Sequence, residues 1–263
     1  MNQPKDIALN YISVAQGKTT QKWYKLLILA VLAGAFIALG GALATFAGAG
    51  FTGTQASLIK GAVFPLGLML VVVCGAELFT GNSLLIAPLI NKDIKITGML
   101  KNWGILYIGN FIGAVVIAVL VVFSHAYGDA AAAASVATAA AKCNLSFGDA
   151  MLRGILCNML VCLAVWASMA SKNVAGKILA IYLPVFAFVV CGFEHSIANM
   201  YYITSGLMTS AEYGIVAAGL NFGNGLLYSL LPSTLGNIIG GGLIAVAYWA
   251  VYFKREKPKD PQQ

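Results

Sequence analysis

The chain has 263 residues, of which 60% are hydrophobic and only 10% charged, and its formal net charge is +7. A soluble domain carries about 25% charged residues, so this composition excludes an ordinary soluble protein and predicts one that lies in a lipid bilayer. The sequence has no aromatic and basic motif of the kind that binds RNA or DNA, and we expect no nucleic-acid partner.

The apolar segments predict the elements in chain order. The first 25 residues mix apolar and polar positions and predict a short amphipathic helix on the membrane surface. Six apolar stretches follow, and most exceed the roughly 20 residues that a spanning helix needs. They cover residues 26–50, 57–90, 103–124, 147–170, 178–208 and 214–253. We therefore expect an all-α integral membrane protein with six transmembrane helices.

The basic residues predict how this bundle is oriented. With six spans, both termini lie on the same side, and of the 16 Lys and Arg residues only Lys60, Lys142 and Arg153 fall on the other side. Loops on the cytoplasmic side of a membrane carry an excess of Lys and Arg. Both termini are therefore predicted to be cytoplasmic, in a multi-pass protein of the cytoplasmic (inner) membrane.

Two of the stretches are too long for simple spans. As one helix, residues 57–90 would extend about 51 Å at about 1.5 Å per residue, whereas the hydrocarbon layer is about 30 Å thick. Residues 178–208 overshoot in the same way. Pro65 and Pro184, together with nearby glycines, predict a break in each, because proline removes a helix donor. Helices broken at corresponding positions of two halves indicate a central solute site.

Two short patterns each occur twice. CGAELFTGN at 74–82 and CGFEHSIAN at 191–199 share Cys, Gly, Glu and Asn, and GNFIG at 109–113 matches GNIIG at 236–240. Polar residues at membrane depth are costly and by default face a bundle interior or a solute path. Because each repeat holds three spans, the second copy is expected to be inverted, which is typical of transport proteins.

The expected organisation follows from this duplication. Its parts are a cytoplasmic amphipathic segment (1–25), a first three-helix repeat (26–130), an extracytoplasmic connecting loop (131–146), a second inverted repeat (147–253) and a cytoplasmic tail (254–263).

Four sequence motifs are distinctive: GAELFTGN (75–82), RGILCNMLVCLAVW (153–166), GFEHSIANMYY (192–202) and LPSTLGNIIGGG (231–242). They resemble the formate/nitrite transporter family, and the resemblance extends from Leu26 to Phe253. It implies a homo-pentamer of six-helix protomers with an aquaporin-like inverted repeat. It also implies that each protomer conducts small monovalent weak-acid anions such as formate, nitrite or hydrosulfide, without a cofactor. The chain is most similar to the hydrosulfide-channel branch.

The resemblance implies roles for individual residues. His195 matches the central histidine of the family, and Thr80 matches the threonine that faces it. Asn158 and Glu194 match polar partners that steady the histidine. The residues expected at apolar constrictions of the pore are Phe64, Leu68, Leu78, Phe79 and Phe188, and those expected in the vestibules are Lys142 and Lys18.

A small anion that crosses an apolar constriction loses its hydration at a large free-energy cost unless it is paired or neutralised. Lys142 is expected to gather the anion, because basic residues at an entrance raise its local concentration. The anion then takes up a proton, crosses as the neutral acid and leaves as the anion. The proton comes either from bulk water or from His195, since an imidazole has an ordinary pKa of about 6.5.

Structural readings stand beside these functional ones. His195 could serve only to satisfy a neighbouring helix. Glu77 and Glu194 are more easily read as acceptors for backbone N–H groups that the helix breaks set free, and their presence in both repeats favours that reading. The apolar residues assigned to constrictions could simply fill the core.

Two other function classes remain as alternatives. An aquaporin-like channel for small neutral solutes would share six spans and inverted symmetry, but no Asn-Pro-Ala pair stands at the breaks. An intramembrane enzyme would need a nucleophile or a metal-ligand set near His195 and Glu194, and the sequence offers neither at a workable spacing. We therefore expect a transport protein and no enzyme.

Overall fold

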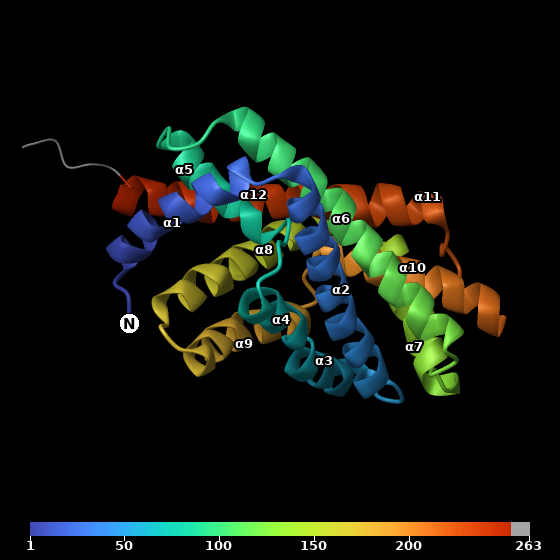
Figure 1. Ribbon diagram of the computed structural model, residues 1–263. Helices are drawn as coiled ribbons and strands as arrows, with labels where there is room; N and C mark the ends of the chain where they lie inside the picture. Colours follow the sequence, from blue (N-terminus) through green and yellow to red (C-terminus); the bar gives the residue numbers. More distant parts are fainter. Residues whose placement is uncertain (254–263) are drawn as a thin grey trace, which may run out of the picture.

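The computed structural model describes residues 1–253, and within that range every regular element is a helix (Figure 1). The predicted cytoplasmic tail, residues 254–263, lies outside the described residues. In chain order the elements are α1 (Pro4–Thr20), α2 (Trp23–Gly48), α3 (Gly53–Val63), α4 (Leu66–Cys74), η1 (Gly81–Leu85), α5 (Ile86–Ile90), α6 (Ile96–Phe123), α7 (Asp129–Cys143), α8 (Phe147–Ala170), α9 (Val174–Val190), α10 (Ser196–Tyr213), α11 (Phe222–Asn224), η2 (Gly225–Leu230), α12 (Leu231–Tyr248) and η3 (Trp249–Phe253).

Five of the described helical runs are long and apolar enough to cross a membrane: Trp23–Gly48, Gly53–Cys74, Ile96–Phe123, Phe147–Ala170 and Phe222–Phe253. Two shorter apolar helices, Gly81–Ile90 and Val174–Val190, accompany them. The predicted helical membrane bundle is confirmed, while the count of six spans stays a prediction. Large apolar side chains such as Leu179 and Leu183, 71% and 68% exposed, cover its outer faces, where lipid would meet them.

The two halves of the chain pack in the same way. In the first half α2 lies against α6, and a Cβ on Gly113 would collide with the carbonyl of Val31. In the second half α8 lies against α12, and a Cβ on Gly240 would collide with the carbonyl of Ile155. Glycine at these positions lets the paired backbones approach closely, as small residues do in membrane bundles.

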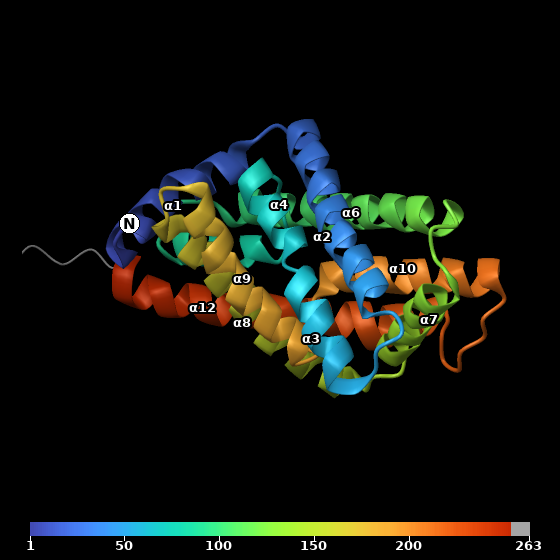
Figure 2. The same ribbon diagram turned by 90° about the horizontal axis from the view of Figure 1, so that it is seen from below.

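The helices α1 and α7 are equivalent elements at opposite ends of the bundle. Both views place α1, with the N-terminus and the end of the described chain, at one end and α7 at the other (Figures 1 and 2). This placement is what an inverted repeat requires.

Helix α7 corrects the expectation of a connecting loop over residues 131–146. The Ala-rich stretch is helical from Asp129 to Cys143 and packs against α10. Alanine has the highest intrinsic helix propensity, so a segment of this composition becomes helical once one face has a neighbour to cover it.

The helix breaks also lie elsewhere than the prolines suggest. Pro184 sits inside the continuous helix α9, and Pro65 marks only a short turn between α3 and α4. Membrane helices tolerate proline because neighbouring groups satisfy the freed carbonyl. The true breaks follow Cys74 and Val190, ten or fewer residues further along each chain segment.

Candidate functional site

Each break begins at a glycine in the left-handed region. Gly75 has φ 80° and follows α4, and Gly192 has φ 67° and lies just beyond α9. An L side chain is strained in this conformation, so glycine allows the chain to turn away from the helix axis. The next residues form no regular element before Gly81 and Ser196 start new helices. Their backbone groups lack helical partners and must find others within the bundle.

One side chain, Asn110 on α6, holds the first break. Its Oδ1 accepts a hydrogen bond from the backbone N–H of Phe79 at 2.9 Å. Its Nδ2 donates to the carbonyls of Ala30 at 2.7 Å and Glu77 at 3.1 Å. The amide therefore ties the irregular segment to α2 and α6 together.

Asn237 on α12 does the same for the second break. Its Oδ1 accepts from the backbone N–H of Ser196 at 2.9 Å, and its Nδ2 donates to the carbonyls of Gly154 at 2.8 Å and Glu194 at 2.9 Å. The asparagine of each repeated Gly-Asn motif thus holds a helix break in place, a role that the sequence alone did not reveal.

An ion pair also closes each break. In the first half, Lys18 donates to Glu77 Oε2 and Oε1 at 2.6 and 2.7 Å and to Asn82 Oδ1 at 2.9 Å. Asn82 in turn donates to Glu77 Oε2 at 2.9 Å and to Asn102 at 2.9 Å. All three ammonium N–H groups of Lys18 are therefore engaged.

The second ion pair joins Lys142 on α7 to Glu194, with Nζ to Oε2 at 2.9 Å. Asn199 donates to the same carboxylate oxygen at 2.6 Å and to Ser229 at 3.1 Å. The Lys142 ammonium also lies over the ring of Tyr202, 5.5 Å from its centroid. Glu194 was expected to steady His195, but its carboxylate serves Lys142 and Asn199 instead.

His195 lies between the two halves as the N-cap residue of α10. Its Nδ1 accepts a hydrogen bond from the backbone N–H of Ala198 at 3.0 Å, so in this geometry the proton of the neutral ring is on Nε2. Nε2 lies 2.9 Å from Oγ1 of Thr80 and donates to it. The ring of Phe188 stacks on the imidazole, with centroids 5.9 Å apart and planes 13° apart. The expected pairing of His195 with Thr80 is thus present.

Asn158 forms no hydrogen bond with His195 within residues 1–253. Its Nδ2 lies 3.1 Å from the carbonyl of Thr80, 3.1 Å from Ser83 Oγ and 2.6 Å from the carbonyl of Asn237. Asn158 therefore fixes the backbone that carries Thr80, and it acts on the histidine only through that residue.

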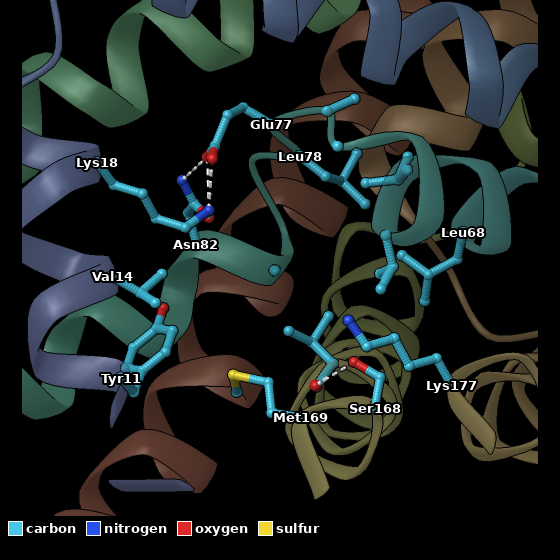
Figure 3. Close-up of a pocket in the computed structure, with 16 residues that line it drawn as sticks. Tyr11, Val14, Lys18, Leu68, Glu77, Leu78, Asn82, Ser168, Met169 and Lys177 are labelled. Carbon is cyan, nitrogen blue, oxygen red and sulfur yellow. Dashed lines mark hydrogen bonds and ion pairs between the residues drawn. The ribbon is translucent and has the colours of Figure 1, made fainter. Parts of the chain in front are cut away.

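A cavity of about 340 Å³ opens on the side of α1, and we call it the α1-side vestibule (Figure 3). Lys18, Glu77 and Asn82 line one side of it, and Leu68 and Leu78 line another. The two leucines are only 2% and 3% exposed, and their role as a constriction stays a prediction.

A second cavity, of about 210 Å³, opens on the side of α7, and we call it the α7-side vestibule. Lys142 and Glu194 line it, together with His195, Phe64 and Phe188. The two phenylalanine rings meet edge to face with centroids 5.8 Å apart. Each is 3% exposed or less, and their role as a constriction stays a prediction.

Phe79 lies away from both vestibules. Its ring packs edge to face on Trp103 and Tyr107, with centroids 5.9 and 5.1 Å apart, at a lateral face of the bundle. The hydrogen bond from its backbone N–H to Asn110 ties this residue to α6, and its expected place at a constriction stays a prediction.

Comparisons with known proteins agree with this geometry. A sequence model of the family described as formate/nitrite transporter matches residues 5–250. The chain is 38% identical to a probable formate transporter of Methanothermobacter thermautotrophicus, over 95% of this chain and 97% of the relative. It is also 38% identical to the formate channel FocA of Escherichia coli (strain K12), over 90% of each chain.

Solved structures give the same result. The chain is similar to a pentameric formate channel with formate bound, with a TM-score of 0.79 and 32% identity, over 88% of this chain and 98% of that one. It is also similar to an FNT family ion channel, with a TM-score of 0.82 and 27% identity, over 94% of this chain and 97% of the other.

Proposed function

The chain belongs to the formate/nitrite transporter family, and from this premise we propose that each protomer passes formate and related weak-acid anions between its two vestibules. It is a multi-pass membrane channel or transporter of small anions and not an enzyme. The names of its relatives favour formate among the possible solutes. Nitrite and hydrosulfide have the same charge and similar size, and they remain predictions.

The hydrogen-bonded pair of His195 and Thr80 between the vestibules is the observation that carries this proposal. Both side chains are buried, 3% and 0% exposed, and we propose that Leu68 and Leu78 on the α1 side and Phe64 and Phe188 on the α7 side form the apolar constrictions next to them. A bare anion in such a place would lack the hydration that it has in water, at a cost of several kcal/mol or more. The neutral acid avoids most of that cost, and the Thr80 hydroxyl offers it a hydrogen-bond partner midway.

The proton for this step comes from vestibule water in our proposal. An imidazolium donates from both ring nitrogens, but Nδ1 of His195 faces the N–H of Ala198, which is itself a donor. The N-terminus of α10 adds a further partial positive charge beside the ring. This surrounding favours a neutral His195 that donates a hydrogen bond and stores no proton.

We propose that the protein works as a homo-pentamer in the cytoplasmic membrane, with α1 on the cytoplasmic side. A pentameric formate channel is among its structural neighbours, which supports the assembly. The excess of Lys and Arg on the side of the termini supports the orientation.

Uptake by purified protein in liposomes tests the proposed function. We expect formate, nitrite and hydrosulfide to enter faster than in protein-free liposomes, and chloride and glycerol to be excluded. Glycerol uptake without anion uptake would replace the proposal with an aquaporin-like channel for neutral solutes. Chloride uptake as fast as that of formate would contradict passage as the neutral acid, because chloride stays ionised at any pH at which the assay can be run.

A further inference from the structure

Each vestibule contains a second lysine that the ion pairs do not use. Lys177, near the start of α9, lines the α1-side vestibule together with Lys18 and Glu77. Lys60, in α3, lines the α7-side vestibule together with Lys142 and Glu194. Among residues 1–253, neither Lys60 nor Lys177 forms an ion pair, and both are half-buried.

Lys60 and Lys177 occupy equivalent positions of the inverted repeat. Lys60 and Lys177 stand as far apart in the sequence as Glu77 and Glu194 do, so the duplication that places the break carboxylates also places this pair. The excess of Lys and Arg in cytoplasmic loops does not explain why a lysine stands at position 60, because Lys60 is one of only three basic residues predicted on the opposite side.

The surroundings hold both side chains toward the cavities. The stem of Lys60 lies on Gly48 of α2, where an added Cβ would come within 2.6 Å of the lysine Cε. Lys177 extends into the α1-side vestibule from the side opposite Lys18 (Figure 3). Neither ammonium is therefore an ordinary solvated surface charge.

The charges in each vestibule leave one positive charge uncompensated. Two lysines and one glutamate are the charged residues that line each cavity, provided the histidine of the α7-side vestibule is neutral. The carboxylates already cancel the charges of Lys18 and Lys142, at 2.6 and 2.9 Å. The lysines expected to gather anions are thus occupied.

We infer that Lys177 and Lys60 are the anion-binding residues of the two vestibules, each offering its free ammonium to a small monovalent anion such as formate. This inference rests on the proposed function and names the residues that hold the anion before it is neutralised. A concave site with one net charge concentrates counter-ions, and the effect weakens as salt screens the field.

Sided flux measurements test this inference. In liposomes at low ionic strength, Lys177→Gln should raise the half-saturating formate concentration about tenfold for flux from the α1 side, the low end of what charged clefts achieve. Lys60→Gln should do the same for flux from the α7 side. The maximal rate should not fall, because only binding of the anion in the vestibule is lost. Arginine at either position should restore the low half-saturating concentration.

Exposed basic residues outside the vestibules provide matched controls. Lys172→Gln removes a charge beside α9, and Arg153→Gln removes one from the other half, and neither should change the half-saturating concentration. An equal effect of the controls would mean that overall surface charge matters, and an unchanged Lys60→Gln, Lys177→Gln double variant would overturn the inference. Absence of formate flux in the unmodified protein would overturn the proposed function itself, and this inference with it.

Bromide provides a readout that does not depend on transport. In crystals soaked with bromide, we expect anomalous density within contact distance of the Lys177 and Lys60 ammonium groups, and its loss at one site in each single variant. Bromide bound at Lys18 or Lys142 instead would contradict the assignment.

Discussion

In the first half of the chain, Lys18, Glu77 and Asn82 close the break after α4, and in the second half Lys142, Glu194 and Asn199 close the break after α9. Asn110 ties the first irregular segment to α2 and α6, and Asn237 ties the second to α8 and α12, the equivalent pair. The asparagine contacts are duplicated closely, whereas the ion pairs differ in detail, because Lys18 also donates to Asn82 and Lys142, within residues 1–253, donates only to Glu194.

The halves differ where the two breaks meet. His195 stands where the first repeat has Leu78, and Thr80 stands where the second repeat has Ile197. Of the duplicated residues, Asn110 and Asn237 satisfy backbone groups at the breaks. Glu77 and Glu194 accept from Lys and Asn side chains, which corrects their expected role as acceptors for backbone N–H groups. We propose that the unduplicated His195 and Thr80 face the path between the vestibules. The comparison therefore separates residues that hold the fold from residues that meet the solute.

The largest effect is expected where the halves agree. Asn110→Leu and Asn237→Leu should each lower the free energy of unfolding in detergent by about 4 kcal/mol, because each leaves several buried backbone groups unpaired. Asn91→Ala, which removes a contact only to Asp93, is the control and should cost less than about 1 kcal/mol. A large loss in one asparagine variant and none in the other would break the proposed equivalence.

The ion pairs should show a smaller and equally symmetric effect. Glu77→Gln or Glu194→Gln should destabilise the protein by about 2 kcal/mol, below the range for fully buried pairs because the lysines are 19% and 14% exposed. Double-mutant cycles with Lys18→Met and Lys142→Met should give coupling energies of about 1–2 kcal/mol in both halves. Coupling in only one half would show that the glutamate of the other half has a different role.

Substitutions at the positions where the two halves differ should affect transport more than stability. Thr80→Val removes the hydroxyl that His195 contacts, and formate flux should fall about tenfold, as expected for one lost hydrogen bond of about 1.4 kcal/mol. The free energy of unfolding should fall by only about 1 kcal/mol, less than in the asparagine variants, because a single buried N–H loses its partner. Ile197→Val alters the equivalent position of the other repeat and should leave flux unchanged, and a flux loss as large as that of Thr80→Val would refute the distinction.

The smallest effect is expected for the pH profile of His195→Asn. Asparagine is a good N-cap residue, so α10 should keep its first turn and the variant should fold. Since we assign no stored proton to His195, the dependence of formate flux on pH should keep its shape even if the rate drops. A flattened or displaced profile in this variant would restore a proton-transfer role to the histidine.

Much of this architecture could be predicted from the sequence, because it depends on repeated sequence motifs and on the length of the apolar stretches. The patterns around Glu77 and Glu194 predicted two broken helices, and the resemblance of the second pattern predicted the pairing of His195 with Thr80. Helix length against membrane thickness predicted that something must interrupt both long stretches.

The remaining features depend on side-chain orientations and tertiary contacts, which the periodicity of the sequence does not predict. Between Gly75 and Thr80 the chain is not helical, so the contacts of the Phe79 ring with Trp103 and Tyr107 could not be predicted from helical spacing. The resemblance implied that Glu194 steadies the histidine, yet α7 brings Lys142 to its carboxylate from another part of the fold. The vestibule position of Lys177 likewise appears only once α1 and α9 are folded.

The central claim is that the solute crosses between the vestibules without charge, and flux under an imposed membrane potential tests it most directly. With a potassium diffusion potential of about 100 mV across liposomes, a bare monovalent anion would gain or lose about 2.3 kcal/mol. We predict that initial formate flux is the same at both signs of the potential and that the lumen gains one proton for each formate. Flux that reverses or changes steeply with the sign of the potential would contradict the account.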